Sequence, residues 1–190
     1  MTVLQRVKEY ESLIQEVHRA IKCMKAYPSI LTEPEHKYLH AIFDKVLFNA
    51  LCGLDLITEL KYLDVSIAVG NSFEATFFAR ITAHSCFEIL DNMNWIVGKE
   101  IMELVKVRLE PQALSDLKSH IKDLNEVKKR HLKELKRIRN ELFGHRMKVG
   151  HDQAERMLGI TPQSIYGVGH RIFEIETNIL SAFGKILERI

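Results

Sequence analysis

The sequence predicts an all-α protein, an antiparallel bundle of four to five long helices. Apolar residues recur at three- and four-residue steps through most of the chain, which is the pattern of amphipathic helices. Helix start signals separate the periodic stretches from one another. Only 4 Pro and 9 Gly occur in 190 residues, which leaves little room for linkers. We therefore expect residues 1–190 to form a single helical domain.

The first two periodic stretches predict a helix over residues 3–26 and another over residues 32–63. The second begins with a capping Thr32 and a Pro just inside, which favours a helix start. Residues 64–70 are predicted to connect it to the next helix. Asn71 stands three residues before a Glu, so we expect Asn71 to cap the third helix.

The third helix is predicted over residues 73–105 and is apolar on almost every side, which is typical of a central helix. Three ionisable residues nevertheless lie in one line along it, His84, Glu88 and Asp91. Burial of such groups is costly unless they meet a partner, so we expect them to contact cations, water or each other. The next helix in the chain is the obvious source of a cation.

The fourth helix is predicted to begin at Pro111 and to run to residue 143 or slightly beyond. Lys128 and His131 occupy positions on its apolar seam where apolar residues are missing. At 100° per residue, Lys128, Arg139 and Arg146 lie within about 20° of one another, beside that seam. Other basic residues of the helix are predicted to point to solvent, namely Lys129, Arg130, Lys133, Lys136 and Arg137.

A last helix is predicted from Thr161-Pro162 to about residue 188, and Gly167 and Gly169 predict a frayed start. Residues 152–156 are expected to add one helical turn before it. Cys23, Cys52 and Cys86 are odd in number and lie among apolar residues, which favours buried thiols over disulfides.

Composition indicates a soluble protein, since 46% of the residues are hydrophobic and 27% are charged. No run approaches the roughly 20 apolar residues of a membrane span, and no signal peptide is evident, so we expect a cytoplasmic protein. Residues 116–148 hold 11 Lys/Arg against 5 Asp/Glu, although the whole chain carries only +2. This basic segment indicates a polyanionic partner or a solvated helix face.

The basic segment ends in the motif R-N-E-L-F-G-H-R, from Arg139 to Arg146. An Arg followed by a polar residue and, six positions on, a His resembles the motif of the HEPN domain superfamily. The full form is most similar to the abortive-infection AbiU-type branch, in which the motif ends a long helix. The resemblance covers the helical layout of most of the chain, but only about eight residues of sequence.

The resemblance implies a metal-independent endoribonuclease without a cofactor, a toxin or phage-defence effector that cuts RNA in the cleft of a homodimer. An antitoxin protein is a further partner that it implies, and a membrane is not. The catalytic residues would be Arg139, Asn140 and His145. The RNA backbone would be held by Lys128, His131, Lys136 and Arg146, with His84, Glu88 and Asp91 as supporting polar residues.

Arg139 and His145 lie about 120° apart on a straight helix. Either Gly144 re-aims the His within one chain, or Arg139 of one chain meets His145 of a second copy. The resemblance favours the second arrangement.

Two alternatives remain at this point. Many HEPN members bind nucleotides or partners without cutting, and Arg139 would then pair with Glu88 or Asp91 in the core. A helical metal hydrolase using His36, His40 and His84 is less favoured, because no other helix supplies a Glu-x-x-His partner.

Overall fold

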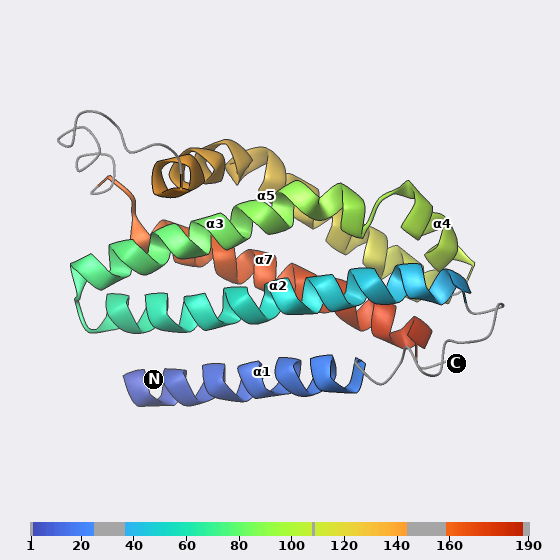
Figure 1. Cartoon of the computed structure of the whole chain (residues 1–190), viewed down its shortest axis with the longest axis horizontal. Helices are drawn as coiled ribbons and strands as arrows, with labels where there is room; N and C mark the ends of the chain where they lie inside the picture. Colours follow the sequence, from blue (N-terminus) through green and yellow to red (C-terminus); the bar gives the residue numbers. More distant parts are fainter. Residues whose placement is uncertain (1, 25–36, 108, 144–158, 188–190) are drawn as a thin grey trace.

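The computed structural model describes residues 2–24, 37–107, 109–143 and 159–187. Over these residues the chain is all-helical, with no strand (Figure 1). The described helices are α1 (Val3–Met24), α2 (Lys37–Ala68), α3 (Ser72–Ile96), α4 (Lys99–Lys106), α5 (Pro111–Phe143) and α7 (Pro162–Leu187).

Four long helices, α2, α3, α5 and α7, pack side by side into a bundle, and α1 lies along the outer side of α2 (Figure 1). α3 packs against α2, α5 and α7, and α7 packs against α2, α3 and α5, so each of these two helices contacts all the other long helices of the bundle. The sequence predicted a central place for α3 alone. α2 and α3 are antiparallel because only residues 69–71 connect them.

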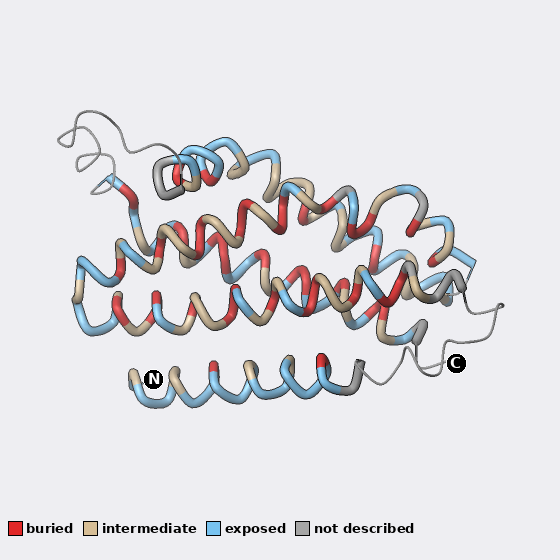
Figure 2. The backbone as a smooth tube through the Cα atoms, in the orientation of Figure 1, coloured by how far each residue is buried: buried red, intermediate tan, exposed pale blue. Residues whose placement is uncertain are grey.

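The core lies where the four helices face one another, and the buried residues turn inward along each of them (Figure 2). Leu60 and Leu63 of α2, Leu90 of α3 and Leu117 of α5 are fully excluded from solvent. Burial of apolar side chains of this size supplies the main driving force for the bundle, about 1.5–3 kcal/mol for each.

α1 joins the bundle through polar contacts as well as apolar ones. Arg6 donates to the carboxylate of Asp64, with 2.8 Å between Nη1 and Oδ1. The hydroxyl groups of Tyr10 and Tyr166 lie 2.7 Å apart, so α1 is tied to both α2 and α7. Burial raises the pKa of the Tyr10 phenol above its usual range, and its hydrogen bond to Tyr166 adds to that shift.

The predicted connection over residues 64–70 is wrong for its first part, because α2 continues to Ala68. Asp64 and Ser66 made this stretch resemble a loop, yet both are buried. The ion pair with Arg6 satisfies Asp64, and the Ser66 hydroxyl donates to the carbonyl of Tyr62 one turn earlier. The chain turns within three residues, helped by Gly70 at a φ of 73°, a backbone conformation that favours glycine.

The predicted third helix, over residues 73–105, is two helices in the structure. α3 ends at Ile96, and α4 begins at Lys99, with Gly98 in an extended conformation at its N-cap position. The start of α3 agrees with the prediction, since the side chain of Asn71 accepts a hydrogen bond from the backbone N–H of Glu74 at 3.2 Å.

The start of α7 is not frayed, contrary to the sequence prediction. The helix runs from Pro162 through Gly167 and Gly169 without a break. A Cβ at position 169 would lie 2.9 Å from Cδ2 of Leu60 and 3.1 Å from Cγ2 of Thr82. Gly169 therefore lets α7 approach α2 and α3 closely.

Cys52 is half-buried and Cys86 is buried, and both thiols are free, as predicted. Cys23 has no described side chain. A search of the described helices finds none that combines the length and the apolar character needed to cross a membrane. Of the sequence predictions, the end of the first helix beyond Met24, the capping Thr32 and the turn over 152–156 lie outside the described residues.

Candidate functional site

Arg139, the first residue of the motif, lies where the last turns of α5 meet α3. Its Nη2 is 3.5 Å from Oε1 of Glu88, and each side chain is 39% exposed. The guanidinium carbon lies 5.0 Å from the centre of the Phe87 ring, which gives it a cation–π contact. The Nε of Arg139 is shielded from solvent and has no hydrogen-bond partner among the described residues.

Glu88 also faces an imidazole on its own helix. Nδ1 of His84, one turn earlier on α3, lies 4.0 Å from the same Oε1 that faces Arg139. One carboxylate oxygen therefore faces both an imidazole and a guanidinium. The His84 and Glu88 side chains are 31% and 39% exposed, so the cluster opens to solvent.

The sequence left open whether Arg139 would pair with Glu88 or with Asp91, and the structure forms the pair with Glu88. Asp91 lies on α3 three residues after Glu88, and it is exposed. The predicted line of three supporting polar residues is thus reduced to His84 and Glu88 at the position of Arg139.

The other motif residues are described only in part. Asn140 follows Arg139 on α5 and is exposed. His145 and Arg146 lie outside the described residues, as does Gly144. That Arg139 and His145 come together, within one chain or across two copies, remains a prediction.

A basic hollow of about 590 Å³ lies along α5 on the N-terminal side of Arg139. We call it the lysine hollow. Its described lining consists of Asn125, Lys128, Lys129, Leu132, Lys133 and Lys136. Among these lysines, Lys129 is paired within the described part of the chain, with its Nζ 3.2 Å from Oε1 of Glu126.

The predicted division of the basic residues of α5 agrees with their exposure, since Lys129, Lys133 and Lys136 are exposed and Lys128 is half-buried, although all four line the lysine hollow. The sequence placed Lys128 with Arg139 beside the apolar seam, and Lys129, Lys133 and Lys136 on the opposite, solvent side. The structure brings all four lysines to one hollow. His131 was predicted to bind RNA with them, but it is half-buried and is not part of the lining.

A buried carboxyl group, Glu176, and a half-buried one, Glu59, were missed by the sequence reasoning. Glu176 of α7 is 1% exposed, and burial raises its pKa to about 8. Burial likewise raises the pKa of Glu59 in α2 to about 7, although the Ser85 hydroxyl donates to its Oε1 at 2.8 Å. Burial among these carboxyl groups also raises the pKa of the Cys86 thiol. The sequence signal was the position of each Glu on an apolar helix face.

A metal site does not emerge from the residues that the structure describes, because no three His, Cys, Asp or Glu side chains among them are grouped to hold an ion. Of the three histidines considered for such a site, His36 lies outside the described residues. His40 and His84 belong to different helices, α2 and α3.

Comparison with known proteins gives no family for the chain. No protein-family model, no curated protein and no solved structure matches it.

Proposed function

We propose that this protein binds RNA along α5 and cuts it without a metal ion, through Arg139, Asn140 and His145. The observation that carries the proposal is the state of Arg139. Its side chain is 39% exposed and lies on the same helix as the lysine hollow. An Arg that served only to hold α5 against α3 would be expected to lie deeper.

The lysine hollow suits the backbone of an RNA strand. Each phosphate neutralised by a lysine releases counterions, which favours binding at low salt. Lys128 and Lys136 line the lysine hollow. We propose that Arg146, the last residue of the motif, extends this basic surface. His131 does not line the lysine hollow, so we do not include it among the residues that bind the RNA there.

The ion pair with Glu88 does not prevent Arg139 from acting on a phosphate. The pair has one long contact of 3.5 Å between half-exposed groups, and such pairs contribute little free energy. A phosphate can therefore replace Glu88, and a guanidinium can bind two of its oxygens at once. In the transition state, the same group stabilises the charge that develops on the equatorial oxygens.

The proposed reaction needs no group beyond the chain and the RNA. The ribose 2′-oxygen attacks the adjacent phosphorus, and the bond from phosphorus to the 5′-oxygen breaks. His145 takes the proton of the 2′-hydroxyl or gives one to the leaving 5′-oxygen, because imidazole exchanges protons near neutral pH. Asn140 orients His145 or a phosphate oxygen. The products are a 2′,3′-cyclic phosphate and a 5′-hydroxyl.

We further propose that the active form is a homodimer in the cytoplasm, in which Arg139 of one copy meets His145 of the other. The resemblance of the motif to the abortive-infection type supports a role in phage defence or in a toxin–antitoxin pair. An antitoxin protein that restrains the cleavage is then an expected partner.

A second candidate function is RNA or nucleotide binding without cleavage. The contact between Arg139 and Glu88 favours it, because a guanidinium that stays paired with a carboxylate adds less positive charge to a bound phosphate. Both candidates share the lysine hollow and differ only in what happens at the motif.

The test is incubation of total cellular RNA with the purified protein in EDTA, followed by analysis of the product ends. His145→Ala is compared with His120→Ala, which replaces a half-buried histidine of the same helix outside the motif. Cleavage to 2′,3′-cyclic phosphate ends by the wild type and His120→Ala, but not by His145→Ala, supports the nuclease. Intact RNA that is nevertheless bound supports the second candidate. Equal cleavage by all three proteins refutes the role of His145.

A further inference from the structure

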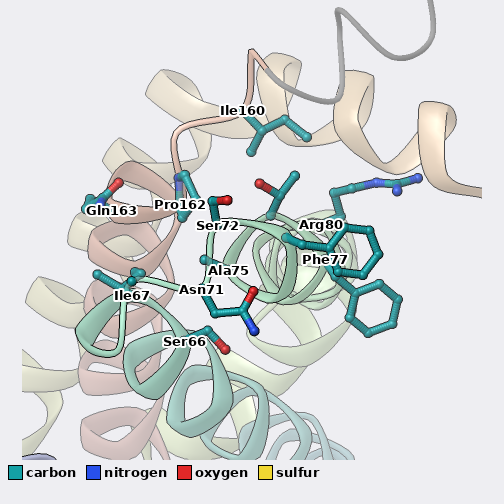
Figure 3. A pocket seen from close by; sticks show the side chains of 13 residues that line it. Ser66, Ile67, Asn71, Ser72, Ala75, Phe77, Arg80, Ile160, Pro162 and Gln163 are labelled. Atoms are coloured by element: carbon teal, nitrogen blue, oxygen red, sulfur yellow. The ribbon is translucent and has the colours of Figure 1, made fainter.

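A cavity lies at the turn between α2 and α3, where α7 begins (Figure 3). Its volume is about 740 Å³, within the range of about 300–1,000 Å³ that is usual for ligand sites. We call it the hairpin pocket. Ser66 and Asn71 lie on one side of it, Ile160 on the opposite side, and Phe77 and Arg80 along its edge (Figure 3).

The walls of the hairpin pocket are mainly apolar. Ile67, Ala75 and Ile160 line its interior, and the rings of Phe73 and Phe77 stand at its mouth. Phe73 is 80% exposed and Phe77 is 48% exposed, although the sequence predicted the helix that carries them to be buried. Exposed aromatic rings beside an apolar cavity mark a surface that gains free energy when it is covered.

The charged side chain that lines the hairpin pocket is positive. Arg80 is the charged residue of its described lining, which contains no Asp or Glu. The Nε of Arg80 is shielded from solvent and has no hydrogen-bond partner within the described part of the chain. The guanidinium end of the side chain extends beyond Phe77 (Figure 3), where an anion could form a charge-assisted pair with it.

Two helices also begin at the hairpin pocket. Ser72 is the first residue of α3 and Pro162 the first of α7, and both line the cavity. Helix N-termini carry partial positive charge, but α2 ends at Ala68 in the same place, and a helix C-terminus carries partial negative charge. The argument therefore rests on the cavity and on Arg80.

We propose that the hairpin pocket binds a small amphipathic carboxylate, with its hydrocarbon chain in the cavity and its carboxylate at Arg80. In Figure 3 the guanidinium extends outward beyond Phe77, so the carboxylate lies at the rim and the chain points inward. Phe77 then covers the first carbons of the chain. This site is independent of the proposed RNA cleavage, because neither Arg139 nor the lysine hollow lines it.

The probe is octanoate, and 1-octanol is its matched neutral control with the same number of carbons. Binding is measured by isothermal titration calorimetry with the whole chain. We expect one saturable site for octanoate and binding at least 10-fold weaker for 1-octanol, since the alcohol cannot form a charge-assisted pair with Arg80. In the series from hexanoate to decanoate, affinity should rise about fourfold for each methylene until the cavity is full.

Three variants assign the binding to the hairpin pocket. Arg80→Met removes the charge but keeps an unbranched side chain, and should lower octanoate affinity to that of 1-octanol. Ser72→Trp places a large ring at the mouth from an exposed position and should weaken both ligands. Lys118→Met, an exposed lysine of α5, is the charge-matched control and should bind as the wild type does.

Four results would overturn the proposal. They are the absence of saturable octanoate binding, equal binding of acid and alcohol, unchanged octanoate binding by Arg80→Met, and unchanged binding by Ser72→Trp. Circular dichroism of each variant establishes that it is folded. If Arg80→Met does not fold, Ser72→Trp and the acid-to-alcohol comparison decide the question. Capture of a protein segment in place of the small acid would also contradict the assignment.

Discussion

Glu88 of α3 holds Arg139 of α5 by a single contact of 3.5 Å, between groups that are both 39% exposed. The pair joins the first residue of the motif to α3, which contacts all the other long helices of the bundle. The same Oε1 lies 4.0 Å from Nδ1 of His84, so removal of the carboxylate changes the surroundings of both Arg139 and His84. Glu88 is therefore the residue whose replacement best separates a structural from a functional Arg139.

Glu88→Gln should leave stability nearly unchanged and tighten RNA binding. A half-exposed ion pair contributes about 0.2–1 kcal/mol, so its loss lowers the free energy of unfolding by no more than that. The same free energy, when no longer spent on Glu88, makes RNA affinity about 1.5- to 5-fold higher. Urea unfolding and fluorescence anisotropy with a labelled RNA measure the two effects.

The control for Glu88→Gln is Glu103→Gln, which removes a carboxylate from α4 that lies 3.9 Å from Lys106. It makes the same change in net charge away from the motif. Equal effects of the two variants on RNA affinity would mean that net charge, and not the release of Arg139, is responsible. Weaker RNA binding by Glu88→Gln alone would indicate that Glu88 positions Arg139 for its ligand.

The lysine hollow predicts a strong salt dependence of RNA binding. Each phosphate contact with a single strand contributes about 0.7 to the slope of log K against log salt. Replacement of Lys128 and Lys136 together by Gln should therefore reduce the slope by about 1.4. The control replaces Lys118 and Lys122, which are exposed on the same helix but outside the hollow. An equal change in slope for both pairs would refute a localised RNA path.

Much of the fold follows from local sequence signals. Asn71, Pro111 and Thr161-Pro162 mark helix starts that the structure confirms, because capping depends on residues three or four positions apart. The extension of α2 to Ala68 could not be predicted in this way. It depends on Arg6, which is far away in sequence and makes Asp64 acceptable in a buried helix.

The candidate site was less predictable than the fold for a similar reason. Helical geometry placed Arg139 beside the apolar seam, and the choice between Glu88 and Asp91 required the position of α5 on α3. The hairpin pocket was not predicted at all. Apolar periodicity placed Phe73 and Phe77 on a buried helix, whereas Phe73 is 80% exposed and Phe77 is 48% exposed in the structure.

The raised pKa values of Glu176 and Glu59 predict that the free energy of unfolding falls as pH rises. Glu176 and Glu59 have folded pKa values of about 8 and about 7, above the value of about 4.3 of an unfolded Glu. Between these values the folded state binds more protons than the unfolded state, so the free energy of unfolding decreases with rising pH. Below pH 7 both groups contribute to this decrease in the free energy of unfolding. From pH 7 to pH 8 Glu176 alone contributes to it.

Urea unfolding between pH 6 and pH 8.5 measures this decrease. Glu176→Gln should abolish the part between pH 7 and pH 8, because a buried amide does not titrate. The control is Glu174→Gln, at an exposed position two residues earlier on the same helix, which should keep the wild-type profile. A Glu176→Gln profile that still falls above pH 7 would contradict a protonated Glu176 in the folded protein.

Gly167 and Gly169 form a matched pair on α7 for which opposite effects are expected. Replacement of a helical Gly by Ala stabilises by about 0.5–1 kcal/mol when nothing obstructs the new methyl group. A Cβ at Gly167 meets nothing within 4 Å, so Gly167→Ala should raise the free energy of unfolding by that amount. At Gly169 the Cβ would lie 2.9 Å from Leu60, which is itself fully buried and has no room to move away.

Overpacking of this kind costs about 1–3 kcal/mol, which exceeds the helical gain, so Gly169→Ala should be less stable than the wild type. Urea unfolding of both variants measures the difference. Equal stabilisation by the two alanines would show that α7 does not approach α2 and α3 as closely as the structure places it. A loss at position 169 alone would support the close packing that positions the start of α7, and with it the hairpin pocket.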